Sequence, residues 1–90
     1  MKTIWKYPLS LLDRQSLGMP AGAQVLTVQL QAGGLQVWAL VDSDAPEVER
    51  HFRIYGTGHP VSDDSGHYVG TFQIQGGALV FHVFDSEMPT

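Results

Sequence analysis

The chain has 90 residues, of which 43% are hydrophobic and 16% charged, with nine acidic side chains, five basic ones and no Cys. This length leaves room for one hydrophobic core and predicts a single domain over residues 1–90. The composition excludes disulfides, thiolate catalysis and zinc sites built from Cys, and the net charge of −4 argues against a nucleic acid partner.

No stretch of the chain approaches the roughly 18 apolar residues of a membrane span, so we expect no membrane partner. The first eight residues lack the apolar segment of a secretory signal, so we expect a cytoplasmic protein.

Two short strand signals come first in the chain. Residues 3–7 are rich in aromatic side chains, and the following Pro8 limits them to a sheet edge or a strand end. Residues 14–19 are a second candidate strand, which ends at the turn indicated by Pro20 and Gly22.

The strongest pattern is a strand, a glycine turn and a second strand over residues 25–41. Alternation over residues 25–31 predicts three apolar side chains on one buried face: Leu26, Val28 and Leu30. After the turn at residues 32–34, residues 35–41 place four apolar side chains on one face: Leu35, Val37, Ala39 and Val41. The opposite face of this second strand is also partly apolar, which predicts a central strand or one covered on both sides.

Alternation continues in the second half of the chain. A loop at residues 42–46 precedes a strand at residues 48–55, in which Phe52 and Ile54 lie opposite four polar or aromatic side chains: Glu49, His51, Arg53 and Tyr55. A longer loop, residues 56–66, leads to a strand at residues 68–74, where one face carries Tyr68, Phe72 and Ile74. Residues 75–77 form a second glycine turn before the last strand, residues 79–84.

These short alternating segments predict an all-β fold. We expect a small single-domain antiparallel sandwich or barrel of about five to seven strands, built from glycine-turned hairpins. Residues 25–31 are expected to pair with 35–41, and residues 68–74 with 78–84. The two hairpins align without a gap, which fits either an internal duplication or the composition that such hairpins share.

The outward positions of the best strands carry Gln where a charged residue is usual. Gln36, Trp38 and Leu40 share one such face, and a weakly charged face with an aromatic residue favours contact with a protein. We therefore predict an interface at these three residues, with another protein or a second copy of the chain as partner. The alternative is that Trp38 packs inside the sandwich.

The start of the longer loop is a candidate ligand site. Its glycines allow the backbone to approach a ligand closely and to present N–H groups to an anion, and arginines stand on the strand before it. We predict a site for a small anionic ligand, such as a nucleotide, at six residues: Arg50, Arg53, Gly56, Thr57, Gly58 and His59. The alternative is a flexible connection between two strands.

A metal-assisted hydrolase is a third possible function. Zinc takes three or four N or O ligands, and the chain has four His: His51, His59, His67 and His82. Their spacing matches no metal motif such as H-x-H or H-E-x-x-H, and no G-x-S-x-G elbow is present. We therefore expect no metal, no cofactor and no enzymatic activity.

Seven short segments are spread over the chain: I-W-K-Y-P-L (4–9), D-R-Q (13–15), M-P-A-G-A (19–23), V-W-A-L-V-D (37–42), G-T-G-H-P (56–60), Y-V-G-T-F (68–72) and V-F-H-V-F (80–84). Together they resemble a family of small proteins from tailed bacteriophages and prophage-bearing bacterial genomes. The resemblance implies an accessory protein made inside a bacterial host cell. It further implies stoichiometric binding of a host protein, such as a defence component, or of a small molecule, and it carries over no site residues.

Overall fold

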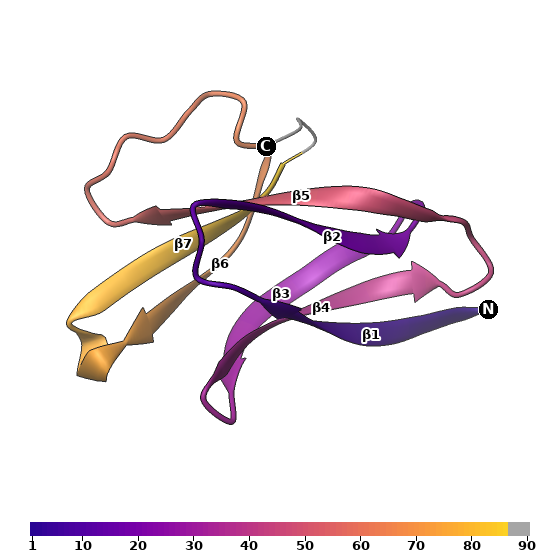
Figure 1. The fold of residues 1–90 in the computed structure, drawn as a ribbon, viewed down its shortest axis with the longest axis horizontal. Coiled ribbons are helices and arrows are strands. Elements are labelled where there is room, and N and C mark those ends of the chain that lie inside the picture. Colours follow the sequence, from indigo (N-terminus) through magenta and orange to yellow (C-terminus); the bar gives the residue numbers. More distant parts are fainter. Residues whose placement is uncertain (87–90) are drawn as a thin grey trace.

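The computed structural model describes residues 1–86 as seven strands in two antiparallel sheets (Figure 1). The first sheet, in the order β1-β4-β3, contains β1 (Lys2–Leu9), β4 (Gly34–Asp42) and β3 (Gln24–Gln31). The second, in the order β2-β5-β7-β6, contains β2 (Arg14–Pro20), β5 (Glu47–Gly56), β7 (Leu79–Ser86) and β6 (His67–Ile74). A 3-10 turn, η1 (Gln75–Gly77), joins β6 to β7. The predicted all-β antiparallel fold is confirmed.

No helix within residues 1–86 has the length and apolar character needed to cross a bilayer.

The core lies between the sheets and takes every second residue of β4. The inward-facing side chains of this strand are buried, as their alternation predicts: Leu35, Val37, Ala39 and Val41. The second sheet contributes five more buried side chains to the same cluster: Met19, Phe52, Ile54, Phe72 and Val83. As expected, β4 is the central strand of its sheet, and β1, which contains Pro8, is an edge strand.

A β-bulge changes the predicted faces of β3. The strand ladder skips Leu26, so this residue does not share the buried face of Val28, and it is 41% exposed. The prediction that Leu26 is buried is therefore wrong. Leu30 does lie on the inward side, opposite Leu35, but it is 44% exposed because the sandwich is open at that end.

A second bulge has the same effect on β6. The ladder passes from Tyr68 directly to Gly70, leaving Val69 as the extra residue. The prediction that Tyr68 shares a face with Phe72 is wrong, because Tyr68 lies on the outer face and is exposed. Phe72 and Ile74, beyond the bulge, keep the inward direction that alternation predicts.

The two sheets approach each other most closely where β3 passes β6 (Figure 1). Gly70 makes this approach possible, since a Cβ atom there would lie 2.8 Å from Val28 Cγ1. The Val28 side chain therefore packs directly on the backbone at Gly70, and this contact closes the sandwich between β3 and β6.

The two glycine turns differ in length. Gln31 pairs with Gly34, so only Ala32 and Gly33 form the first turn, with φ angles of 51° and 80°. Positive φ at both central residues is the signature of a type I′ turn. Ile74 pairs with Leu79, so the second turn has four residues and includes η1. Similar composition thus produces two different turns.

We expect Ala32→Asn to raise the free energy of unfolding by about 1 kcal/mol, because Asn tolerates the left-handed region better than Ala. Urea denaturation of the variant and the wild type measures this difference. An unchanged or lower free energy of unfolding would contradict the assignment of positive φ at residue 32.

Candidate functional site

The segment between β5 and β6, residues 57–66, folds over the outer face of the second sheet. Arg53 Nη1 donates a hydrogen bond to Asp64 Oδ1 at 2.9 Å. The hydroxyl oxygens of Tyr55 and Ser65 lie 2.6 Å apart. Because the segment covers it, Arg53 is only 5% exposed although it projects from the outer face of the sheet.

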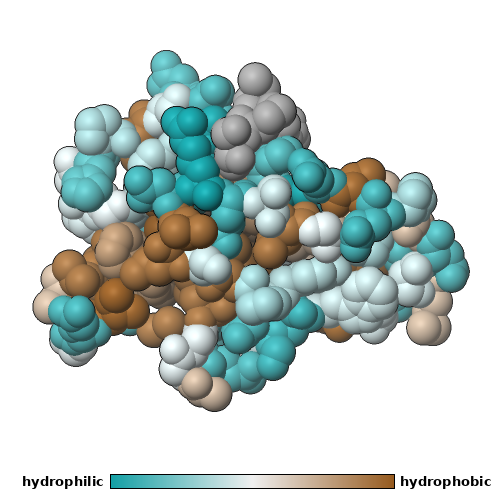
Figure 2. All heavy atoms as spheres, in the orientation of Figure 1, coloured by the Kyte–Doolittle hydropathy of each residue, from teal (hydrophilic) through white to brown (hydrophobic). Residues whose placement is uncertain are grey.

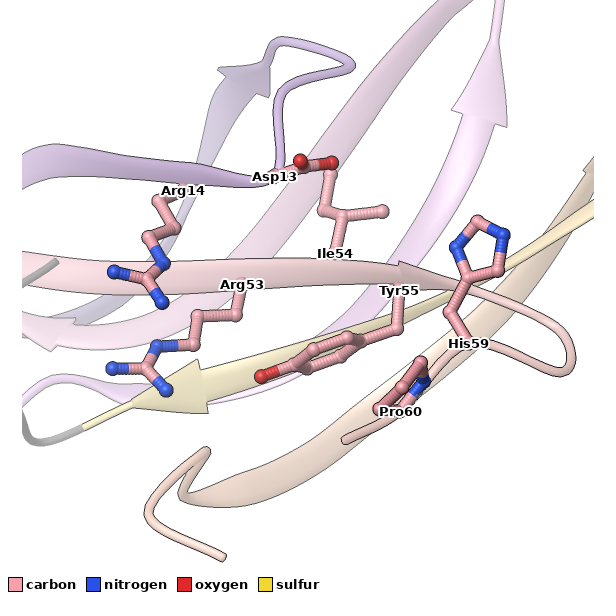
Figure 3. A pocket seen from close by; sticks show the side chains of 7 residues that line it. All are labelled: Asp13, Arg14, Arg53, Ile54, Tyr55, His59 and Pro60. Atoms are coloured by element: carbon pink, nitrogen blue, oxygen red, sulfur yellow. The ribbon is translucent and has the colours of Figure 1, made fainter. Parts of the chain in front are cut away.

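A pocket of about 280 Å³ is bounded by the start of β2, the end of β5 and the loop that follows (Figure 3). Its lining combines two guanidinium groups, a phenol, an imidazole and a carboxylate: Asp13, Arg14, Arg53, Ile54, Tyr55, His59 and Pro60. Figure 3 shows the two guanidinium groups side by side at one end, with the Tyr55 hydroxyl pointing toward them. The His59 ring lies at the other end of the pocket.

Arg50 lies apart from this pocket. It is three residues from Arg53 in one strand, so the two side chains project from opposite faces of the sheet. The Arg50 guanidinium donates to both carboxylate oxygens of Asp85, at 3.1 and 2.8 Å, and to the carbonyl oxygen of Ala23 at 2.6 Å. The structure therefore brings together Arg53 and His59 of the predicted ligand site, and separates Arg50 from them.

The predicted loop residues border a second pocket. Gly56, Thr57 and His59 line a hollow of about 280 Å³ together with the start of β7. The imidazole of His59 packs on Gly56, where an added Cβ would lie 3.0 Å from the ring carbon Cε1. Gly58 has a φ of 88° and open space around it. His59 therefore separates the glycines from the arginine end of the first pocket.

A chain of hydroxyl groups crosses the outer face of the second sheet through His82. Its Nε2 lies 2.7 Å from Thr57 Oγ1, and its Nδ1 lies 2.9 Å from Thr71 Oγ1. Thr71 Oγ1 is in turn 2.6 Å from the hydroxyl of Tyr68. Both ring nitrogens of His82 are thus occupied by hydroxyl groups.

The histidines that are candidate metal ligands lie in different surroundings. His51 is on the outer face of β5, His59 packs on Gly56, and His82 contacts threonines. Within residues 1–86, no three His, Asp or Glu side chains form a group that could hold a metal ion.

Two ionisable groups have shifted pKa values where β5 meets residues 57–66, the covering segment: Tyr55 of β5 and Asp64 of the segment. Burial alone would raise the pKa of the Tyr55 phenol, but Ser65 and the Arg53 guanidinium outweigh it and the pKa lies below its usual value. The hydrogen bond from Ser62, followed by that from Arg53, lowers the pKa of Asp64 below its usual 3.8. A carboxyl group whose pKa is lower in the folded state than in the unfolded state stabilises the fold at pH values above its unfolded-state pKa. This stabilisation is lost as the pH falls through its folded-state pKa.

The residues predicted as an interface share the outer face of β4 and are half-buried: Gln36, Trp38 and Leu40. Ile4 of β1 lies opposite Leu40 and is exposed. Lys6 reaches across β4, so that its Nζ donates to Gln31 Oε1 at 2.8 Å. Trp38 therefore lies outside the core, partly covered by its neighbours on the sheet.

A larger hollow, the apolar groove, opens at the end of the sandwich beside the β3–β4 turn and has a volume of about 370 Å³. Apolar side chains and two glycines line it: Leu9, Leu11, Leu30, Gly33, Gly34, Leu35, Phe72 and Ile74. Leu11 is 52% and Leu30 44% exposed. Figure 2 shows apolar side chains gathered on the left half of this view, between β7 and the connection from β1 to β2.

A family model described as a domain of unknown function, DUF7352, matches residues 1–90. The chain belongs to this family. No match to the DUF7352 chain was found among curated proteins or among solved structures.

Local sequence carries no signal for two features of this DUF7352 domain. Arg14 joins the first pocket because the register of β2 and β5 places it opposite Arg53, and that pairing spans distant parts of the chain. The exposure of Leu30 depends on how the sheets separate at the groove. Both features follow from packing between elements.

Proposed function

We propose that this DUF7352 domain binds a protein partner without catalysing a reaction, and that the apolar groove is its contact surface. The proposed setting is the cytoplasm of a bacterial cell, with the domain as a phage or prophage accessory protein. Its partner is then a host protein, such as a component of host defence. Only the resemblance of the seven sequence segments supports this setting. The groove supports the proposed contact surface.

Exposure of large apolar side chains around the groove supports this proposal most strongly. Leu11 and Leu30 line the groove and are exposed, and Leu12 and Leu79, which adjoin lining residues, are also exposed. Exposed apolar patches around a hollow are typical of surfaces that bind an apolar segment of another protein. A leucine or phenylalanine side chain of the partner is the chemistry that fits this lining.

The outer face of the first sheet is a second candidate surface. Trp38, Leu40 and Ile4 form an apolar group there, with Lys6 opposite Trp38 as a charged neighbour, and such a group favours contact with a second copy of the chain. Trp38 and Leu40 are half-buried, whereas Leu11 and Leu30 of the groove are exposed, so we give the groove priority.

We expect Leu30→Gln to weaken partner binding by about 30-fold, because an apolar anchor at the centre of an interface contributes about 2 kcal/mol. Immobilised domain and variant are incubated with bacterial lysate, retained proteins are quantified, and the retained protein is then titrated to obtain its Kd. Leu26→Gln is the matched control, since Leu26 lies in the same strand with 41% exposure against 44% for Leu30, outside the groove lining.

Equal binding by the Leu30 and Leu26 variants would remove the groove from the proposal. Loss of binding in Trp38→Gln alone would move the contact to the outer face of the first sheet. Sedimentation velocity at increasing concentration tests for a second copy as the partner. A monomer that retains no protein contradicts the proposed function.

A further inference from the structure

Two arginines face each other in the first pocket, and no contact among the described residues explains why they do so. Arg14 and Arg53 are directly opposite in the register of β2 and β5, and both line the pocket. Like charges at directly opposite positions of an antiparallel pair are destabilising. No described residue forms an ion pair or hydrogen bond with the Arg14 side chain, so its charge is not offset within residues 1–86.

Arg53 has hydrogen-bonding capacity that the fold does not use. It is 5% exposed, and Nη1 donates to Asp64, whereas the buried Nε has no partner among the described residues. A buried donor without a partner is costly, and most such donors in folded proteins are satisfied. The unused Nε belongs to a side chain that lines the pocket, so a ligand there can supply the acceptor.

We propose that this pocket binds an oxyanion, a phosphate or carboxylate group of a small molecule, between the guanidinium groups of Arg14 and Arg53. The planar guanidinium presents N–H donors that match such an anion, and a bound anion offsets the repulsion between the two cations. This proposal is independent of the proposed function, because the pocket lies on the outer side of the second sheet and the apolar groove lies between the sheets.

The other groups of the pocket define what else the ligand carries. Asp64 offsets part of the Arg53 charge, and the Asp13 carboxylate lies apart from the guanidinium groups in Figure 3. The Tyr55 ring, Pro60 and the His59 ring continue the lining away from the arginines. The pocket therefore fits a single anionic group on a short, partly apolar body.

The test is a titration of the isotope-labelled domain with sodium phosphate and, separately, sodium acetate, at ionic strength held constant with sodium chloride. The Nε–Hε signal of Arg53 in the NMR spectrum reports directly on the unused donor. We expect a saturable shift of this signal with one of the two anions. A response to phosphate alone identifies a phosphate ligand, and a response to acetate alone a carboxylate.

Arg14→Gln is expected to raise the Kd of that anion by about 10-fold or more, because one charged hydrogen-bonding partner is lost. Arg14 is exposed, so this variant tests the site without removing the buried arginine. Lys2→Gln is the matched control, with the same change in charge at an exposed position of β1 in the other sheet, and its Kd should equal that of the wild type.

Two results would overturn the proposal. One is an Arg53 signal that shifts no more with phosphate or acetate than with chloride at equal ionic strength. The other is an equal change in Kd for Arg14→Gln and Lys2→Gln, because equal changes would show that the anion responds to the net charge of the domain and not to a specific site.

Discussion

Gly66→Ala is expected to lower the free energy of unfolding by about 3–5 kcal/mol, through backbone strain together with overpacking. Gly66 has a φ of 92°, and a Cβ there would lie 2.1 Å from the carbonyl oxygen of Asp85 and 2.7 Å from Ser86 Cα. These are backbone atoms of β7, which cannot rotate away as a side chain can. The end of the covering segment would have to separate from the strand.

Gly58→Ala is the matched control for this prediction. Gly58 belongs to the same segment and has a φ of 88°, but nothing lies within 4 Å of its added Cβ. We expect a loss of about 1 kcal/mol from backbone strain alone. Urea denaturation of the two variants measures the difference. Equal losses would show that the close approach of Gly66 to β7 does not contribute.

Asp85→Ala is expected to destabilise the domain by about 3 kcal/mol, because it leaves the guanidinium of Arg50 partly buried without its counter-charge. The side chains of Arg50 and Asp85 are 23% and 9% exposed, and two hydrogen bonds join them. Arg50 also holds the carbonyl oxygen of Ala23, so the pair connects β7, β5 and the turn before β3.

A double-mutant cycle with Arg50→Met separates the pair from its surroundings. The double variant is expected to be more stable than Asp85→Ala alone, since no charge is then left unpaired. Asp44→Ala serves as the exposed control: its carboxylate contacts the amino group of Met1 with 83% of the side chain exposed, and its loss should cost less than about 1 kcal/mol. Equal effects of Asp85→Ala and Asp44→Ala on stability would contradict the structural role of the pair.

Alternation predicts the fold well where a strand is uninterrupted. In β4 every second residue from Leu35 to Val41 is buried, as the apolar pattern indicates. The predictions for Leu26 and Tyr68 fail for one reason: a bulge inserts one residue and reverses the direction of the side chains on one side of it. Bulges depend on how two strands pair. Gly70 is a local signal for the bulge in β6, because a Gly inside a strand often marks one, whereas the β3 segment carries no such signal.

Some features of the candidate site could be predicted from the sequence, and others could not. The separation of Arg50 from Arg53 follows from the two-residue period of a strand, so the sequence does contain that information. The approach of Arg14 to Arg53 requires the register of β2 and β5, and the burial of Arg53 requires the fold of residues 57–66. Both come from contacts between distant segments, which composition and spacing do not reveal.

The closure along β3 and β6 has a consequence for aggregation. Each sheet has two edge strands, and β3 and β6 face each other, so their unpaired backbone groups are shielded from other molecules. The outer edges of β1 and β2 remain. β1 carries Lys2, Lys6 and Pro8, and β2 ends in Pro20, and such residues discourage an incoming strand. The domain can therefore expose an apolar groove while its edge strands disfavour aggregation by strand pairing between molecules.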